Sequence, residues 1–172
     1  METNQNFAGR HEAKTRIPRL DVRKGRLSLY KGANVPPEEY NYAHGQLKGI
    51  SLRSRETAGG EITFMILHFK YGESSFEVSS IASSSISADL ISRLVNMRDK
   101  DSEIQIDVWP KDNYTNCSVR ENGEKLPFSF LPKSVRKQNG FNVSVDSSER
   151  DAAVMKMIEE INRRIGYVPS KQ

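Results

Sequence analysis

The sequence predicts a mainly β fold, built on a small five-stranded Greek-key barrel with one helix inside the strand order and one after it. Three observations predict this class. Short runs of β-branched and aromatic residues recur, pairs of Gly, Asn and Asp separate them, and only two segments have helical periodicity. The first helix falls between the third and fourth strands, as in such a barrel. A sandwich of two sheets is the structural alternative.

The strands are expected where β-prone residues cluster, at residues 46–53, 62–70, 75–79, 103–109 and 114–120. The run ITFMILHFK is apolar on both faces, which favours a central strand. In the run EIQIDVW, strict alternation separates an apolar set from a polar set, so that Trp109 points away from Ile104, Ile106 and Val108. Gly49 indicates a bulge or bend in the first strand.

Turn chemistry continues the pattern after the fifth strand. Asn122-Gly123 predicts a tight hairpin that leads into a further strand at residues 125–130. A basic loop is expected at residues 133–140, followed by a short strand at residues 141–145.

Two segments carry apolar residues at helical spacing. The first is expected to begin with Ser87 as its N-cap and to present Leu90, Ile91 and Leu94 on one face. The second covers residues 149–165 and has a capping-box spacing at its start. We expect the second helix to pack on the barrel, with a partner protein as the alternative.

The N-terminal 43 residues show no sustained period and contain several turn formers. We therefore expect an extended basic arm at residues 1–43, with a short strand at residues 26–30. The β domain is expected at residues 44–145, and the C-terminal helix and tail at residues 146–172. Residues 1–31 carry eight basic and three acidic side chains, whereas the rest carries 18 basic and 19 acidic ones. This asymmetry favours an anionic partner; a disordered tail without a role is the alternative.

Composition argues against several classes of protein. No apolar run approaches the roughly 20 residues of a membrane span, and the first residues lack the apolar core of a secretory signal. Cys117 is the only cysteine, which excludes an internal disulfide and a zinc site built from several cysteines. We expect a cytoplasmic location, in the host cell if the protein is viral, and no membrane partner.

Enzyme motifs are missing from the sequence. The three histidines, His11, His44 and His68, have no metal-ligand spacing, and no glycine-rich phosphate loop is present. The acidic residues between 99 and 107 are expected to be solvated and not to bind a metal. The sequence therefore predicts a non-enzymatic protein without a cofactor or metal.

One resemblance adds to this interpretation. Residues 45–130 resemble small phage-type single-stranded DNA-binding proteins with an OB-fold, through the runs GQLKGISLR, ITFMILHFKYGESSFEVSS, LISRLVNMRDKDSEIQIDVW and NGEKLPFSF. The resemblance covers about half of the chain and implies that exposed bases bind on an OB-like barrel. The chain departs from this family in its basic end, RRIGYVPSKQ, where an acidic tail is common, and in its long arm. Both departures bear on a role in DNA replication.

Single-stranded nucleic acid is held by aromatic side chains that stack on bases and by cations that follow the backbone. The expected stacking residues are Trp109, Tyr71 and Tyr114; the alternative for Trp109 is packing under the arm or the last helix. Phe64, Phe76, Phe128 and Phe130 are expected in the core. The expected cations are Lys48, Arg53 and Arg55 in the first strand, Lys133, Arg136 and Lys137 in the basic loop, and Arg16, Arg19, Arg23, Lys24 and Arg26 in the arm.

These features support two hypotheses of different classes. The first is a sequence-tolerant single-stranded DNA-binding protein. The second is a structural or assembly protein, such as a phage virion component, whose arm contacts neighbouring subunits or another protein. A small protein that inhibits or recruits a host enzyme is a third possibility, for which the sequence selects no target.

Overall fold

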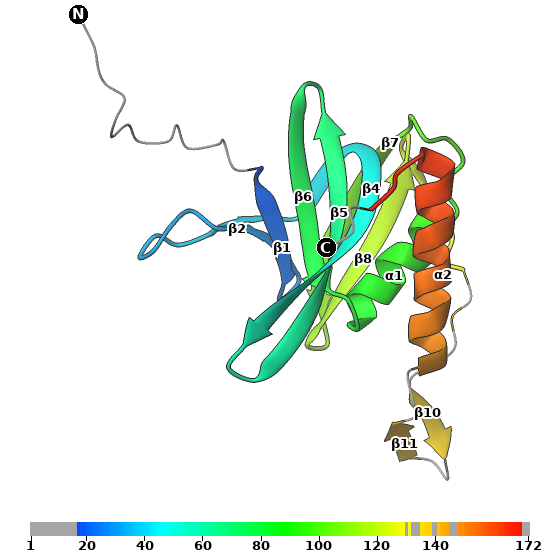
Figure 1. Cartoon of the computed structure of the whole chain (residues 1–172). Helices are drawn as coiled ribbons and strands as arrows, with labels where there is room; N and C mark the ends of the chain where they lie inside the picture. The colour runs from blue at the N-terminus through cyan, green and yellow to red at the C-terminus, as the bar shows by residue number, and fades with distance from the viewer. Residues whose placement is uncertain (1–16, 130, 132–134, 139–140, 145–147, 170–172) are drawn as a thin grey trace, which may run out of the picture.

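The computed structural model of this chain describes residues 17–129, 131, 135–138, 141–144 and 148–169. Two helices lie in this part of the chain, α1 (Ser85–Leu94) and α2 (Ser148–Ile165) (Figure 1). The strands are β1 (Arg19–Arg23), β2 (Arg26–Leu29), β3 (Glu38–Tyr40), β4 (Tyr42–Thr57), β5 (Gly60–Tyr71), β6 (Ser74–Ile81), β7 (Glu103–Lys111), β8 (Tyr114–Glu121), β9 (Glu124–Lys125), β10 (Val135–Gln138) and β11 (Phe141–Ser144).

The described strands form one open, mixed sheet of nine strands, in the order β3-β2-β1-β6-β5-β4-β7-β8-β9, and a separate antiparallel pair, β10-β11. The fold is therefore mainly β, as predicted, but the expected closed barrel is not found. The physical reason lies at the edge of β6. There β1 pairs with β6 in parallel, with Arg19 opposite Glu77 and Leu20 opposite Val78, and so occupies the edge that a closing strand would need.

The predicted position of the first helix is confirmed, because α1 follows β6 and precedes β7. Its N-cap is Ser84, whereas the sequence predicts Ser87. The backbone of Ser84 is extended, and its Oγ accepts a hydrogen bond from the N–H of Ser87. Ser87 is instead fully buried, and its hydroxyl bonds to Ser80 Oγ and to the carbonyl of Ile81.

The expectation of an extended arm is wrong for residues 19–40, because this segment contributes β1, β2 and β3 to the main sheet. The short strand expected near residue 26 is confirmed as β2, which pairs with both β1 and β3. Leu27 is fully buried in the core, and Leu20 and Val22 pack against it. Strands of three to five residues are too short to show a period in the sequence. Residues 1–16 lie outside the described part.

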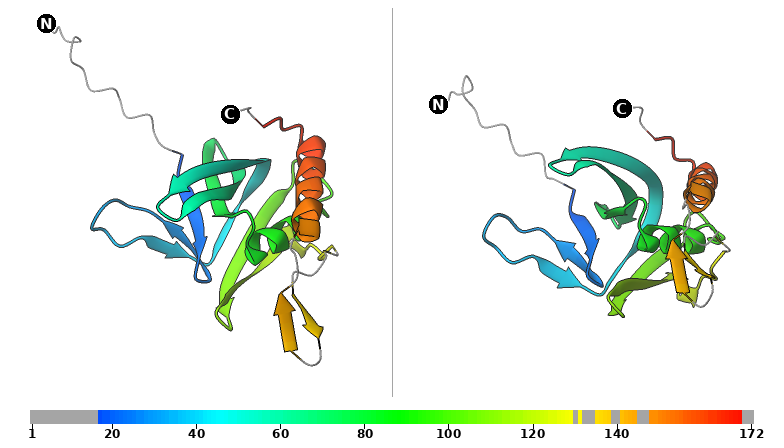
Figure 2. Two further views of the ribbon diagram at one scale, coloured as in Figure 1. Left: turned by 60° about the horizontal axis from the view of Figure 1, so that its bottom comes forward. Right: turned by 90° about the horizontal axis from the view of Figure 1, so that it is seen from below.

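Strand β4 is shared by two halves of the sheet. Its first residues, 42–46, pair with β7, and residues 46–57 pair with β5. The register shifts between Leu47 and Gly49, which confirms the expected irregularity at this glycine. Figure 2 shows the resulting curl: β4 and β5 arch over the interior, with β7 and β8 on the opposite side.

The core lies inside this curl and is filled by α1. Leu90, Ile91 and Leu94 are fully buried, which confirms the predicted apolar face of the helix. They belong to the same cluster as Ile104 and Ile106 of β7 and the buried residues Ile50, Leu67, Val78 and Val119 of the surrounding strands. At about 25 cal/mol per Å² of buried apolar surface, this cluster is the main favourable contribution to folding.

Helix α2 closes the gap where β4 separates from β7. Beyond Gln46 the backbone of β4 no longer pairs with β7. The side-chain amide of the buried Asn162 instead hydrogen-bonds to the backbone of β4 on that side. Asn162 Oδ1 accepts from the N–H of Ile50, and Asn162 Nδ2 donates to the C=O of Ile50, both at 2.9 Å. The chain after α2 then crosses β4, where a Cβ added to Gly49 would lie 2.3 Å from the ring of Tyr167.

Two other expectations need correction. The strand expected at residues 125–130 is limited to β9 in the described part of this range, residues 125–129, of which only Lys125 is in a strand. The basic loop expected at residues 133–140 contains β10, which pairs with β11. In the described part of the chain, neither helix is long and apolar enough to cross a membrane.

We predict that Asn162→Ala lowers the free energy of unfolding by about 2 kcal/mol or more, because it leaves the N–H and C=O of Ile50 buried without partners. Lys156→Ala, at an exposed position on the same helix, should change it by less than about 0.5 kcal/mol. Urea unfolding followed by circular dichroism measures both. Equal effects of the two substitutions would contradict this role for Asn162.

Candidate nucleic-acid interface

Trp109 lies near the end of β7 with 41 % of its surface exposed. Its neighbours in the alternating pattern, Ile104, Ile106 and Val108, are buried, as expected. Trp109 is paired across the ladder with Asn116 of β8, so its side chain shares a sheet face with a polar residue. An indole ring in this position is accessible to a flat partner.

The turn between β1 and β2 packs against this end of β7. The N–H of Gly25 donates to Thr115 Oγ1 at 2.9 Å, and a Cβ added to Gly25 would lie only 2.4 Å from the backbone nitrogen of Pro110. Gly25 also has a φ of +75°, which disfavours other residues. Both views in Figure 2 place this turn beside the β7–β8 turn. The contact therefore requires glycine at this position.

A shallow hollow forms where the two turns meet. It is lined by Lys24 from the first turn and by residues of the second, namely Pro110, Lys111, Asp112, Asn113 and Tyr114. Tyr114 is 70 % exposed, and both lysines are exposed. The structure thus brings two predicted site residues together, Lys24 and Tyr114, with Arg23 and Arg26 adjoining Lys24 and Gly25 in the chain. Trp109 precedes Pro110 in β7 and does not line the hollow, and alternation points its side chain to the face of the strand opposite to that of Pro110. We call the hollow and the adjoining Trp109 the turn site.

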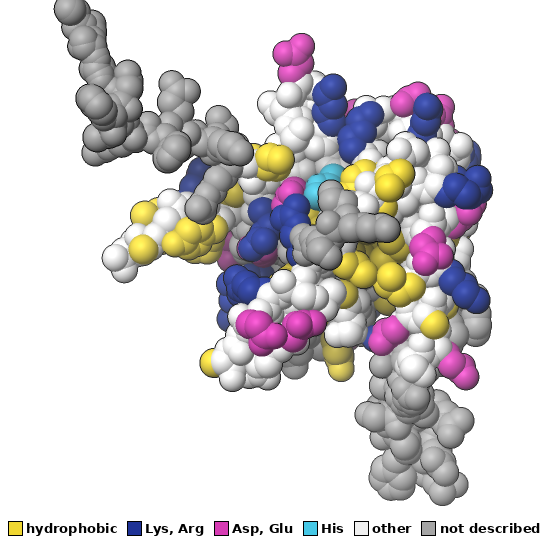
Figure 3. Space-filling view, viewed as in Figure 1, with side chains coloured by type: hydrophobic (Ala, Val, Ile, Leu, Met, Phe, Trp, Pro, Cys, Tyr) yellow, Lys and Arg dark blue, Asp and Glu magenta, His cyan; other side chains and the backbone are white. Residues whose placement is uncertain are grey.

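A second group of predicted cations shares one face of the sheet. Arg19 and Arg23 of β1 lie on the face of the sheet that points away from α1, which we call the outer face, as do Arg53 and Arg55 of β4. Figure 3 looks onto this face, and Lys and Arg side chains gather where β1, β5 and the adjoining part of β4 lie in Figure 1. Two of the four are tied to acids: Arg19 to Asp21 at 3.2 Å, and Arg53 to Glu77 at 2.9 Å.

Arg55 lies over the ring of Phe64, with its guanidinium carbon 5.7 Å from the ring centroid. We expected Phe64 in the core, but it is half-buried on the outer face. The expectation is wrong because the run around Phe64 has large apolar residues on both faces, so the sequence does not show which face is buried. Phe128 is 47 % exposed, Phe76 packs against the core, and Phe130 lies outside the described residues.

Tyr71 is exposed, but it lies at the end of β5 and contacts the His44 ring with a centroid distance of 4.9 Å. His44 pairs with Gln105 of β7, four residues before Trp109, which corresponds to about 13 Å along the strand. Glu103 Oε1 lies 2.9 Å from His44 Nδ1. Because this carboxylate repels phosphates, the region is less favourable for a polyanion. Lys48 is exposed at the β4 irregularity. Tyr71 is therefore not part of the turn site.

Four other predicted cations are not assigned to the turn site or to the outer face. Arg16 and Lys133 lie outside the described residues. Arg136 and Lys137 lie in β10, where they pair with Val143 and Asn142 of β11.

Sequence reasoning missed two candidates, Lys111 and Phe64. Lys111 could have been found from its position between Pro110 and the Asp112-Asn113 turn, because residues at such a turn are usually exposed, as they are here. The combination of Lys24 and Lys111 with Trp109 and Tyr114 can hold a nucleic-acid strand, because lysines attract phosphates and aromatic rings stack on any base.

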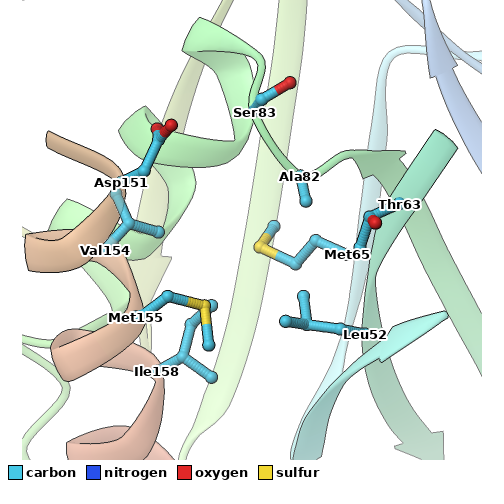
Figure 4. A pocket seen from close by; sticks show the side chains of 9 residues that line it. All are labelled: Leu52, Thr63, Met65, Ala82, Ser83, Asp151, Val154, Met155 and Ile158. Carbon is cyan, nitrogen blue, oxygen red and sulfur yellow. The ribbon is translucent and has the colours of Figure 1, made fainter. Parts of the chain in front are cut away.

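A second depression lies between α2 and the strands β4 and β5 (Figure 4). Its walls are apolar, with Leu52 and Met65 on the sheet side and Val154, Met155 and Ile158 on the helix side. Asp151 is the single charged residue that lines it. An apolar groove with an acidic rim does not attract a phosphate backbone, so we leave it out of the interface.

Other reactive groups in the described residues point to no metal or thiol chemistry. Burial raises the pKa of the Cys117 thiol to about 12, which makes it a poor nucleophile. The described residues contain no group of three or more His, Cys, Asp or Glu side chains that could hold a metal ion.

We predict that Gly25→Ala displaces the β1–β2 turn from Pro110 and destabilises the protein. The substitution adds a clash with backbone atoms to the cost of about 1–2 kcal/mol for a side chain at positive φ. Gly123→Ala is the matched control, because Gly123 has a φ of +88° but nothing within 4 Å of an added Cβ. Only Gly25→Ala should shift the NMR signal of the Trp109 indole N–H. An equal shift in both variants would contradict the contact.

Comparison of this chain with protein-family models, curated proteins and solved structures gives no match.

Proposed function

We propose that this protein binds single-stranded DNA without strong sequence preference, through the turn site and the adjoining cations of the outer face. The observation that carries this proposal is the contact of the β1–β2 turn with Pro110 and Thr115, because it sets Lys24 beside the exposed phenol of Tyr114, at the end of the strand that carries the exposed Trp109. Neither group alone would suffice, since cations hold the backbone and aromatic rings hold the bases.

The strand order gives further support. Five successive strands of the sheet run β6-β5-β4-β7-β8, with α1 after β6. If β4, β5, β6, β7 and β8 are numbered 1 to 5, their order in the sheet is 3-2-1-4-5. An OB barrel has the same neighbours, with strand 5 also paired to strand 3. The sheet therefore corresponds to such a barrel opened between strands 3 and 5. In OB-folds the face of strands 2 and 3 and the loop between strands 4 and 5 bind oligonucleotides. The corresponding parts here are the outer face of β5 and β6 and the β7–β8 turn.

The binding mode follows from the charges. Lys24 and Lys111 are exposed, so each can replace a counterion of the phosphate backbone. Arg53 is partly neutralised by Glu77 and Arg19 by Asp21, so these two contribute less. One or two bases stack on Trp109 and Tyr114, which makes binding tolerant of sequence because every base has an aromatic face.

We predict that Trp109→Ala weakens binding of a fluorescein-labelled oligo-dT about 5- to 150-fold, the equivalent of about 1–3 kcal/mol for one stacked base. Tyr30→Ala is the control, because Tyr30 is 70 % exposed at the other end of β2 from the β1–β2 turn. Fluorescence anisotropy measures both. In the unmodified protein, oligo-dT should quench the fluorescence of Trp109, the only tryptophan. Equal affinity of Trp109→Ala and the unmodified protein would overturn the site.

We predict that Lys24→Ala and Lys111→Ala each reduce the slope of log K against log salt by about 0.7, the value for one phosphate contact on a single strand. Lys100→Ala should leave the slope unchanged, because Lys100 lies beyond the opposite end of β7 from the turn site. Titrations with oligo-dT, duplex DNA and RNA at several salt concentrations provide the slopes. Tighter binding to the duplex than to oligo-dT would argue against a single-strand binder.

An assembly role is the second candidate function, and one observation favours it. The connection between β2 and β3 extends away from the rest of the sheet in Figure 1, and it carries exposed apolar surface at Tyr30 (70 %) and Val35 (51 %). Exposed apolar groups of this kind suit contact with a neighbouring subunit. Concentration-dependent oligomers in sedimentation, together with no binding to any oligonucleotide, would favour this candidate over DNA binding.

A further inference from the structure

Three polar side chains on neighbouring strands of the outer face form a chain of contacts that the sequence did not suggest. Ser51 Oγ of β4 lies 2.7 Å from His68 Nε2 of β5, and His68 Nδ1 lies 3.6 Å from Glu77 Oε1 of β6. The register explains the arrangement, because His68 is directly opposite Glu77 and Ser51 is opposite Ile66, two residues along β5. Hydroxyl, imidazole and carboxylate are therefore aligned across three strands.

The surroundings favour a neutral imidazole that accepts the hydroxyl proton. Desolvation is the largest influence on the pKa of His68 and lowers it, and Arg53 lowers it further, while Glu77 acts in the opposite sense. The ring of Tyr167 covers His68 from the segment after α2, at 5.7 Å between centroids. The relay needs the tautomer whose proton is on Nδ1, the nitrogen nearest to Glu77, because His68 Nε2 is then the acceptor for Ser51.

Glu77 and Arg53 complete the environment. The Glu77 side chain is only 8 % exposed and is held by two hydrogen bonds from Arg53, at 2.9 and 3.3 Å. Arg53 is two residues from Ser51 on the same face of β4, and its side chain is 42 % exposed. A guanidinium has five N–H donors, so Arg53 keeps three for an anion that forms above Ser51.

We propose that Ser51, His68 and Glu77 form a nucleophile–base–carboxylate relay, which makes Ser51 reactive toward small esters, with Arg53 as the cation that stabilises the oxyanion. Each role in this set has a candidate residue: a hydroxyl nucleophile in contact with a base, a carboxylate beside the base, and a cation two residues from the nucleophile on the same face of β4. We expect small esters to react best, because the Tyr167 ring lies beside His68. The relay shares the outer face with cations of the proposed DNA-binding surface, but its test uses no nucleic acid, so the two proposals can fail separately.

The reaction balances without a cofactor. Ser51 Oγ forms a bond to the carbonyl carbon of the ester while its proton moves to His68 Nε2, and the carbonyl electron pair moves to oxygen beside Arg53. The intermediate collapses, the bond to the alcohol oxygen breaks, and the alcohol leaves with the proton from His68. Water then repeats the sequence on the acyl group, which releases the acid and restores Ser51.

A fluorophosphonate probe tests the proposal on the whole chain. It should form one adduct on Ser51, found by mass spectrometry, with fluoride as the leaving group. Ser51→Ala should abolish the adduct, and His68→Asn should slow it about 100-fold, the typical contribution of a general base. Ser54→Ala is the matched control, because Ser54 is a serine of the same strand that bonds to Thr63 and not to a histidine. It should leave the rate unchanged.

A pH profile separates catalysis from a purely structural role. The labelling rate should rise with pH and level off below the ordinary His pKa of 6.5, because the neutral form of His68 is the base. Burial, Glu77 and Arg53 set the His68 pKa, and Tyr167 and Arg19 are the other titratable groups that face this cluster. His68→Asn should remove the profile. Absence of a Ser51 adduct in the folded protein, or a His68→Asn variant that reacts as fast as the unmodified protein, would overturn the proposal.

Discussion

The architecture depends on how β4 separates from β7. After Gln46 the strand continues with β5 alone, and the backbone of Ile50 would be left without partners in the interior. A single side chain, Asn162, supplies both missing hydrogen bonds. Because an unpaired buried backbone group costs about 1–3 kcal/mol, this amide allows one strand to serve both halves of the sheet. The curl of the sheet around α1 follows from that division.

The second constraint is the position of β1 on the edge of β6. The β1–β2 pair occupies the opening between β6 and the β7–β8 hairpin, and it reaches the second of these through Gly25. The sheet therefore stays open, but the β1–β2 pair covers the edge of β6. The outermost described strands are short and charged: β3 carries Glu38 and Glu39, and β9 is Glu124–Lys125. Such edges resist pairing with other chains.

The long elements were predictable from the sequence, whereas the contacts between them were not. The central strand at β5 and the helix α2 have strong local signals, and both were expected within a few residues of their observed bounds. The strands β1 and β3 were missed because three to five residues carry no period, and the pairing of β1 depends on β6. Phe64 was placed in the core because an apolar run on both faces does not reveal which face is inside.

The same reasoning applies to the two candidate sites. The exposure of Trp109 followed from alternation in β7, but the approach of Lys24 depends on a turn contact across the sheet. The row of Ser51, His68 and Glu77 depends on the register of three strands, which a list of histidine spacings cannot show. Both sites lie on surfaces that the N-terminal strands help to build.

The central claim is that the β1–β2 turn and the end of β7 form one binding surface. Photo-crosslinking with an oligonucleotide that contains 5-iodouracil, followed by mass spectrometry of the peptides, tests it most directly. The account predicts crosslinks to Trp109 or Tyr114, which decline when unlabelled oligo-dT competes. Crosslinks confined to peptides away from these two turns, or none above the level seen with an unrelated protein of similar charge, would contradict it.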